Sequence, residues 1–383
     1  ELFLPILKRI LQIKNIDLNI RGCKYTLLSY ACFYNEIEIV QLLLRTETID
    51  VNSYLFQEGN TPLMISISND HNEISELLIK DKRTDINAIN QSTKLTALNL
   101  AMDKKKFDIV RLIIANPRTD VNVCSSKSGN TPLMLSILND NNEISELLIK
   151  DKRTNLNTIN HDNLTALEIA INKNQLNIVK LLLSNPEIGP SLNEIHGHTL
   201  LEKSIVNLNI DIMNEILNFY GDNIQTQTDQ INKALKTVLT NFYEKFNKKK
   251  ITLELFLPIL KRILQIKNID LNIRGCKYTL LSYACFYNEI EIVQLLLRTE
   301  TIDVNSYLFQ EGNTPLMISI SNDHNEISEL LIKDKRTDIN AINQSTKLTA
   351  LNLAMDKKNF DIVKLLIANP RTDVNVCSSK SGN

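Results

Sequence analysis

Residues 61–87 read TPLMISISNDHNEISELLIKDKRTDIN. Thr61 opens a short apolar run, an Asn/Asp break follows, and a second apolar run then repeats at i, i+3 and i+4, the spacing of one helix face. The apolar residues of the second run are Ile74, Leu77, Leu78 and Ile79. A polar segment ends the stretch at Asp85-Ile86-Asn87. The pattern predicts a helix, a turn, a second helix and a loop.

The same opening recurs along the chain at spacings of 34 or 35 residues on either side of one longer gap. Each opening has a threonine followed two residues later by a leucine. These pairs are Thr26 and Leu28, Thr61 and Leu63, Thr96 and Leu98, Thr131 and Leu133, Thr165 and Leu167, and Thr199 and Leu201, followed beyond the gap by openings at Thr279, at Thr314 with Leu316, and at Thr349. A period of this length indicates a solenoid, in which each unit buries its apolar face against a neighbour.

The units resemble ankyrin repeats, whose hallmark is a Thr-Pro-Leu-His-x-Ala opening in a unit of about 33 residues. Thr61-Pro62-Leu63 and Thr131-Pro132-Leu133 match this opening, as does the copy at Thr314-Pro315-Leu316. Its alanine is matched by Ala31, Ala101 and Ala170. The resemblance spans nearly the whole chain. It implies an all-α fold, an ankyrin-type helix-turn-helix solenoid that forms a curved, open superhelix, and a surface that binds other proteins.

Departures from the family pattern predict local differences. Asn or Asp stands where the family has a glycine between its two helices. Because asparagine tolerates the left-handed backbone region better than most residues, we expect it to make these turns. His71 and its copy His324 lie at such turns, where the resemblance favours a structural role in which side chains satisfy backbone groups. The family's first-helix histidine is replaced by Ser29, Met64, Asn99, Met134 and Glu168.

A second, longer repeat contains the first. Residues 1–130 return at 254–383 with three substitutions. These are Lys106 against Asn359, Arg111 against Lys364 and Ile113 against Leu366. Both ends of the chain fall inside the pattern, so we expect it to be a window cut from a longer array. The predicted blocks are the second half of a degenerate unit at 1–25, six ankyrin-like repeats at 26–225, a degenerate seventh unit at 226–278, and three repeats with the start of a fourth at 279–383.

The seventh unit is expected in the long gap between Thr199 and Thr279. Its overlong first helix would begin at Thr228 or Asp229, the candidate N-caps. The apolar face of that helix would consist of Ile231, Leu235, Val238, Leu239, Phe242 and Phe246. A second helix near Pro258 and a closing turn at Asp270-Leu271-Asn272 would complete the unit. The super-repeat therefore comprises seven units in 253 residues.

The composition excludes several classes of protein. A formal charge of −1 gives no excess of cations to bind nucleic acid, and no stretch approaches the roughly 18 apolar residues of a membrane span. The cysteines lack the paired spacing of a metal site or a disulfide framework, which favours a reduced, intracellular setting by default; the localisation is otherwise undetermined. They are Cys23, Cys32 and Cys124 with their copies Cys276, Cys285 and Cys377.

Two patterns of charged or titratable residues are candidate sites. His196 and His198 lack a third ligand at metal-site spacing, and the sequence has neither a recognisable nucleophile motif nor a phosphate-binding glycine loop. We therefore expect no enzyme activity, metal or cofactor. The basic run at 80–83 recurs at 150–153 and 333–336. It is either a periodic track for phosphate or an acidic filament, or a set of solvated helix ends, and the Asp in each run favours the second interpretation.

The candidate contact residues are large and apolar. Tyr54-Leu55-Phe56, copied at Tyr307-Leu308-Phe309, follow the closing turn, where the resemblance places an exposed binding loop. Three such residues in an exposed loop would anchor a partner or a second copy of the chain. Alternatively, they fold under the loop and cover an adjacent, imperfect unit. Both interpretations stay open at this point.

Three functions fit the sequence. The first is a non-catalytic scaffold for protein–protein interaction. The second is a structural protein that assembles into filaments or lattices, because seven stacked units at about 10 Å each would place identical patches about 70 Å apart. The third is a secreted effector that binds a host protein. The sequence names no partner; a protein or the chain itself is expected, and nucleic acid is not.

Overall fold

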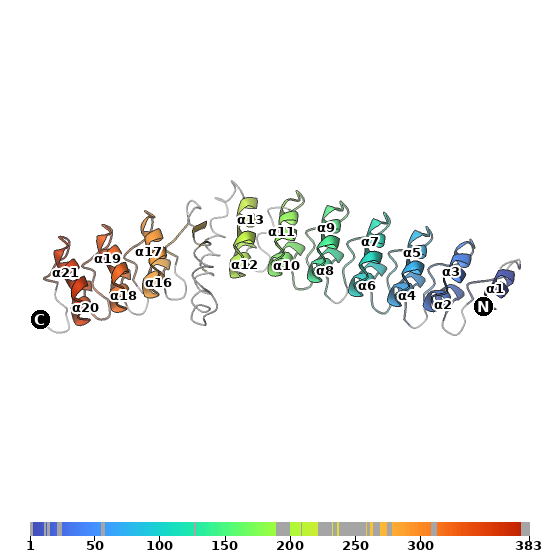
Figure 1. Cartoon of the computed structure of the whole chain (residues 1–383), viewed down its shortest axis with the longest axis horizontal. Helices are drawn as coiled ribbons and strands as arrows, with labels where there is room; N and C mark the ends of the chain where they lie inside the picture. Colours follow the sequence, from blue (N-terminus) through green and yellow to red (C-terminus); the bar gives the residue numbers. More distant parts are fainter. Residues whose placement is uncertain are drawn as a thin grey trace. The chain divides into compact units, whose positions relative to one another are not determined.

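In the computed structural model of the protein the described residues are 3–10, 13, 16–20, 25–54, 58–125, 128–188, 200–207, 209–220, 232, 236, 258, 261–262, 269–273, 278–307 and 312–376. These residues form 19 helices, labelled in Figure 1. The chain divides into two compact units, residues 1–197 (unit 1) and 198–383 (unit 2). Each unit is a stack of short helix pairs, so the predicted all-α, helix-turn-helix solenoid is confirmed for each.

The described residues of unit 1 form a single helix followed by five helix pairs. The single helix is α1 (Phe3–Ile10), and it packs against the second helix of the first pair. The pairs are α2 (Leu27–Phe33) with α3 (Ile37–Leu44), α4 (Pro62–Ser68) with α5 (Asn72–Lys80), α6 (Ala97–Asp103) with α7 (Phe107–Ala115), α8 (Pro132–Leu138) with α9 (Asn142–Lys150), and α10 (Ala166–Asn172) with α11 (Leu176–Leu183).

Unit 2 contains four described pairs. They are α12 (Leu200–Val206) with α13 (Ile210–Tyr220), α16 (Leu280–Phe286) with α17 (Ile290–Leu297), α18 (Pro315–Ser321) with α19 (Asn325–Lys333), and α20 (Ala350–Asp356) with α21 (Phe360–Ala368). Of the predicted overlong helix, only Asn232 and Lys236 lie within the described residues, both in helical backbone. The block boundaries near residues 25, 225 and 278 stay predictions.

The repeated threonines explain where the first helices begin. Each described one accepts, through Oγ1, the N–H of the residue three positions later at 3.2–3.3 Å, which satisfies one of the free donors at a helix N-terminus. They are Thr26, Thr61, Thr96, Thr131, Thr165, Thr279, Thr314 and Thr349. Thr199 lies outside the described residues. Pro62, Pro132 and Pro315 occupy first-turn positions, where a missing N–H is tolerated.

The turns between paired helices use the left-handed backbone region, as predicted. Asn35, Asp70, Asp140 and Asn174 have φ angles of 60°, 65°, 56° and 57°. Lys105 has a φ of 57° at the equivalent turn, and its copy Lys358 has a φ of 58°. A lysine gains no local side-chain hydrogen bond in this conformation, so these two turns are strained in a way that the sequence did not indicate.

The histidines at two of these turns join neighbouring repeats. His71 donates from Nδ1 to the carbonyl oxygen of Cys32 in the preceding repeat at 2.8 Å, and His324 makes the same contact with Cys285. The predicted structural role of these two side chains is therefore confirmed. His196 and His198 lie outside the described residues.

Within each unit the helices stack by type. First helices pack on first helices, in the order α2, α4, α6, α8, α10 and again α16, α18, α20; second helices pack on second helices in the same way. The leucine of each opening is buried at every interface of unit 1, with an exposed fraction of at most 1%. The hydrophobic core of unit 1 therefore extends along the whole stack of helix pairs, as expected when each repeat buries its apolar face against the next.

Among the described residues of each unit, successive closing turns are tied to one another by hydrogen bonds, the asparagine ladder. Asn52 donates from Nδ2 to the Arg83 carbonyl at 2.9 Å and accepts the Asp85 N–H at 2.7 Å, and Asp85 accepts the N–H of the next ladder residue, Asn87, at 3.1 Å. The donor contact recurs at 2.7–2.9 Å for every member. The ladder asparagines are Asn19, Asn52, Asn87, Asn122, Asn157, Asn272, Asn305 and Asn340.

One helix has the same sequence in both units but a different environment. Tyr30 on α2 is 45% exposed, whereas its copy Tyr283 on α16 is 3% exposed. Burial raises the pKa of the Tyr283 phenol, with smaller contributions from Tyr287 and Glu289.

Candidate binding groove

The arginine of each basic run is engaged with the preceding repeat. Arg83 donates from Nη2 to the Leu44 carbonyl at 2.7 Å and from Nη1 to the Thr46 carbonyl at 2.9 Å, where α3 ends. These carbonyls lack helical partners, so the guanidinium caps the helix C-terminus. Arg153 and Arg336 make equivalent contacts with Ile114 and Leu297. Neither interpretation of the basic run, phosphate track or solvated end, anticipated this role.

An aspartate in the same run holds the arginine in place. The Asp81 carboxylate accepts the Arg83 Nε–H at 3.0 Å and an Nη2–H at 2.7 Å. This pair lowers the pKa of Asp81, chiefly through the side-chain hydrogen bond, against the opposing effect of burial. The pKa values of Asp151 and Asp334 are lowered by their own arginines in the same way. The first lysine of each run is paired too: Lys80, Lys150 and Lys333 each lie within 3.6 Å of a glutamate one helical turn away.

The predicted contact residues are described only in part. Tyr54 and Tyr307 are each 36% exposed and follow buried serines, Ser53 and Ser306. Leu55, Phe56, Leu308 and Phe309 lie outside the described residues. Their proposed role as partner or self-assembly contacts therefore stays a prediction.

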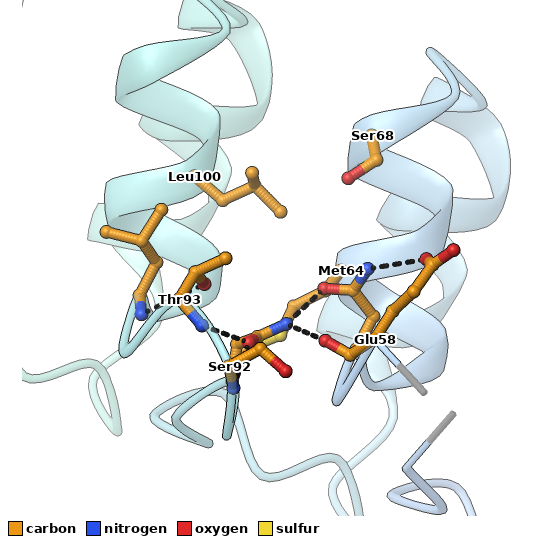
Figure 2. Close-up of a pocket in the computed structure, with 9 residues that line it drawn as sticks. Glu58, Met64, Ser68, Ser92, Thr93 and Leu100 are labelled. Atoms are coloured by element: carbon orange, nitrogen blue, oxygen red, sulfur yellow. Dashed lines mark hydrogen bonds between the residues drawn. The ribbon is translucent and has the colours of Figure 1, made fainter. Parts of the chain in front are cut away.

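A groove opens beside these loops, between the second and third complete repeats of unit 1. It has a volume of about 410 Å³. Figure 2 shows Ser68 of α4 and Leu100 of α6 on opposite sides of the space, with the loop residues Ser92 and Thr93 below them. The lining residues are Glu58, Asn60, Met64, Ser68, Asn90, Ser92, Thr93, Leu95 and Leu100.

The groove has an apolar floor and a polar rim. Met64 is 1% exposed, and Leu95 and Leu100 are half-buried, so the floor is aliphatic. The rim carries Glu58, which is exposed, and the hydroxyl groups of Ser92 and Thr93. A concave, largely apolar site with a few polar groups is the usual form of a binding pocket.

The rim is fixed by one buried side chain. Asn90 is 2% exposed and donates from Nδ2 to the Glu58 carbonyl at 2.8 Å and to Asn60 Oδ1 at 2.6 Å. Its Oδ1 accepts the N–H groups of Ser92 at 2.8 Å and Thr93 at 2.7 Å. All four hydrogen-bonding positions of the Asn90 amide are thereby used, and both walls of the groove are hydrogen-bonded to this one residue. The rim is therefore pre-organised.

A glycine lets the two loops approach each other. Gly59 has a φ of 68°, and a Cβ at this position would lie 2.8 Å from the Gln91 backbone nitrogen. Any larger residue would push the loops apart. Sequence patterns do not indicate the groove, because its two walls belong to loops about 30 residues apart that the Asn90 contacts bring together.

The described residues contain no cluster of three or more His, Cys, Asp or Glu side chains arranged to hold a metal ion. Cys32 and Cys285 are buried, and burial raises the pKa of both thiols. Of the helices that the structure describes, none combines the length and apolarity that crossing a membrane requires.

Comparison with known proteins agrees with this architecture. The family described as ankyrin repeats (3 copies) matches residues 3–90, 82–160, 98–196, 253–343 and 310–378. The crystal structure of EF0377, an ankyrin repeat protein, matches with a TM-score of 0.43 and 24% sequence identity over 50% of this chain and 96% of that one. No curated protein sequence shows significant similarity. With the family matched over well more than half of its length, this chain belongs to the ankyrin repeat proteins.

Proposed function

We propose that the chain is a non-catalytic scaffold that binds a segment of another protein in the groove between the Glu58 and Ser92 loops. Ankyrin repeats are in general modules of protein–protein interaction. The observation that supports this groove is its fixed rim: Asn90 holds both walls through four hydrogen bonds, so binding would require little ordering of the protein.

The chemistry of the groove defines its occupant. Met64, Leu95 and Leu100 offer an apolar floor for one aliphatic side chain. Ser92 and Thr93 on the rim can exchange hydrogen bonds with the backbone of an extended segment, and the exposed Glu58 favours a cation beside the aliphatic residue. We therefore expect an extended peptide with a Leu, Ile or Met next to a Lys or Arg.

The duplication sharpens the test, because residues 311–353 repeat the sequence of 58–100. Peptides selected from a random displayed library should bind with a stoichiometry of two per chain. Leu100→Glu should abolish one of the two sites in a calorimetric titration. Leu135→Glu, at the equivalent half-buried position of the next repeat, should leave both sites intact. Unchanged stoichiometry in Leu100→Glu would refute the groove.

Self-assembly is the second candidate function. It is favoured by the near-identity of the two copies at exposed positions, for example the equal exposure of Tyr54 and Tyr307. Scaffold function alone would let such positions diverge. Negative-stain images over a concentration series separate the candidates. Discrete particles of constant size would exclude assembly, and regular fibres would support it.

A further inference from the structure

Exposed apolar side chains recur at one position of the closing turns. This position is the second residue after a ladder asparagine, and each described residue there is aromatic, aliphatic or cysteine and is exposed. Arg21 and Arg274 stand at the same position in the sequence and lie outside the described residues. In unit 1 this row consists of Tyr54, Ile89, Cys124 and Ile159, and in unit 2 it contains Tyr307 and Ile342. The exposed fractions of the aliphatic and aromatic members lie between 36% and 48%.

Hydrogen bonds hold the members of the row at fixed positions. The ladder ties each closing turn to the next, and the loops after the turns close on themselves. Asn90 donates its N–H to the Leu95 carbonyl at 2.8 Å, and Asn160 donates to Leu164 at 3.0 Å. In Figure 1 the loops that join successive helix pairs of unit 1 lie along one edge of that unit. Single exposed apolar residues are common, but a periodic set in one register forms a continuous patch.

The residues beside the row are uncharged. Ala88 and Asn90 flank Ile89, Val123 and Ser125 flank Cys124, and Thr158 and Asn160 flank Ile159. The chain as a whole has a formal charge of −1. Asp120 is close enough to Cys124 to raise the pKa of its thiol beyond the effect of burial, so the row is uncharged only at the residues immediately beside its members.

The spacing between members of the row indicates what kind of partner can match it. Stacked repeats advance by about 10 Å. A β-strand places successive side chains of one face about 6.7 Å apart, so an added strand would fall out of register after one repeat. A second copy of this chain carries apolar side chains at the same period, whatever its value.

We propose that the row of unit 1 is a self-association seam, in which two copies of the chain pack side by side in antiparallel directions about a two-fold axis. A two-fold contact sets the same patch against itself. The axis lies between the second and third members, so Tyr54 faces Ile159 of the other copy, and Ile89 faces Cys124. The inference rests on the self-assembly candidate and is independent of the groove.

Disulfide trapping tests this pairing on the full chain. Cys23, Cys276 and Cys377 are first replaced by serine; Cys32 and Cys285 are buried and stay. Copper-phenanthroline then oxidises pairs of thiols, each disulfide releasing two electrons and two protons to the oxidant. Burial and Asp120 raise the pKa of the Cys124 thiol, so the reaction is run at pH about 9.

In this background Ile89→Cys should give a covalent dimer at least tenfold faster than the parent, because the new thiol would face Cys124 of the other copy. Leu147→Cys is the matched control, since Leu147 is 40% exposed on α9, away from the row. Equal rates for Ile89→Cys and Leu147→Cys would overturn the seam. A parent that cross-links as fast as Ile89→Cys, through Cys124 alone, would overturn the antiparallel pairing.

A second measurement does not depend on new thiols. Ile89→Asn with Ile159→Asn should raise the dimer dissociation constant in sedimentation at least tenfold while leaving the melting temperature of the protein unchanged. A dimer dissociation constant that is unchanged in this variant would refute the row and leave self-assembly standing. Particles that are monomeric in the unaltered protein at all concentrations would refute both, and peptide binding in the groove would be unaffected in either case.

Discussion

Replacing Arg83 with alanine removes the contact by which one repeat caps the helix of the repeat before it. The guanidinium reaches the carbonyl oxygens of Leu44 and Thr46 at 2.7 and 2.9 Å, some 37 to 39 residues back along the chain. The substitution therefore weakens an interface between repeats and leaves the interior of each repeat intact.

The size of the effect follows from the two contacts. A hydrogen bond from a charged donor contributes roughly 1.5–3 kcal/mol when it is shielded from water. The Arg83 side chain is 34% exposed, so water can replace part of each bond and the contribution falls to about 1 kcal/mol per contact. We expect Arg83→Ala to lower the free energy of unfolding by about 2 kcal/mol, and Arg83→Lys by nearly as much, because a point charge cannot reach both carbonyls.

Urea unfolding followed by far-ultraviolet circular dichroism measures this change. The transition is fitted with a nearest-neighbour model, because repeat arrays unfold in parts. Lys82→Ala is the control: it removes the same charge from an exposed neighbour that carries no cap. Arg336→Ala is a built-in replicate, since Arg336 donates to the carbonyls of Leu297 and Thr299, both at 2.7 Å.

The two arginine variants should agree within about 0.5 kcal/mol, the usual limit of additivity for distant sites. If Arg83→Ala and Lys82→Ala shift the midpoint equally, the arginine contributes only its charge and the capping argument is wrong. If Arg83→Ala lowers the free energy of unfolding but Arg336→Ala leaves it unchanged, the energy of the interface depends on its position in the array rather than on the arginine contact.

Three further changes test the fold. Lys105→Gly should raise stability by about 1 kcal/mol in urea unfolding, because it relieves a left-handed lysine, whereas Asn35→Gly should change it by less. Thr131→Ala should lower stability by about 1–2 kcal/mol in the same assay, since α8 loses its N-cap; an unchanged midpoint would contradict this. The lowered pKa of Asp151 stabilises the fold above the unfolded value of about 3.9, and this contribution is lost as the pH falls through the lower folded value. Asp151→Asn should therefore make the free energy of unfolding fall less steeply between pH about 4 and 2. An unchanged fall over this pH range would contradict the pairing of Asp151 with Arg153.

Local chemistry was predictable from the sequence, and contacts between repeats were not. Thr61 and Asn35 act on residues within one turn of themselves, so their types and spacing predict a helix start and a left-handed turn. Arg83 acts on residues in the repeat before it, and nothing in a run of mixed charges indicates that partner. The groove was missed for the same reason, because Asn90 builds it by reaching back to Glu58.

One asparagine shows this limit directly. Asn99 donates to the Val123 carbonyl at 3.0 Å, whereas its copy Asn352 accepts the Thr349 N–H and closes a capping box. The two residues have the same neighbours in sequence on both sides. Their different partners therefore depend on the surroundings of each repeat in the stack, which a local pattern does not contain.

The asparagine ladder has a consequence for how such a gene can change. Asn19 and Asn272 are equivalent rungs, 253 residues apart, and each donates to the next turn at 2.9 Å. Asp270 lies two residues before Asn272, and its backbone N–H donates to the side-chain oxygen of Asn232 at 3.1 Å. A recombination event that adds or removes one whole 253-residue block therefore joins one ladder asparagine to the position of an equivalent one. We expect such a junction to keep the hydrogen bonds of the ladder, even though side chains such as Asn99 and Asn352 take different partners in the two copies.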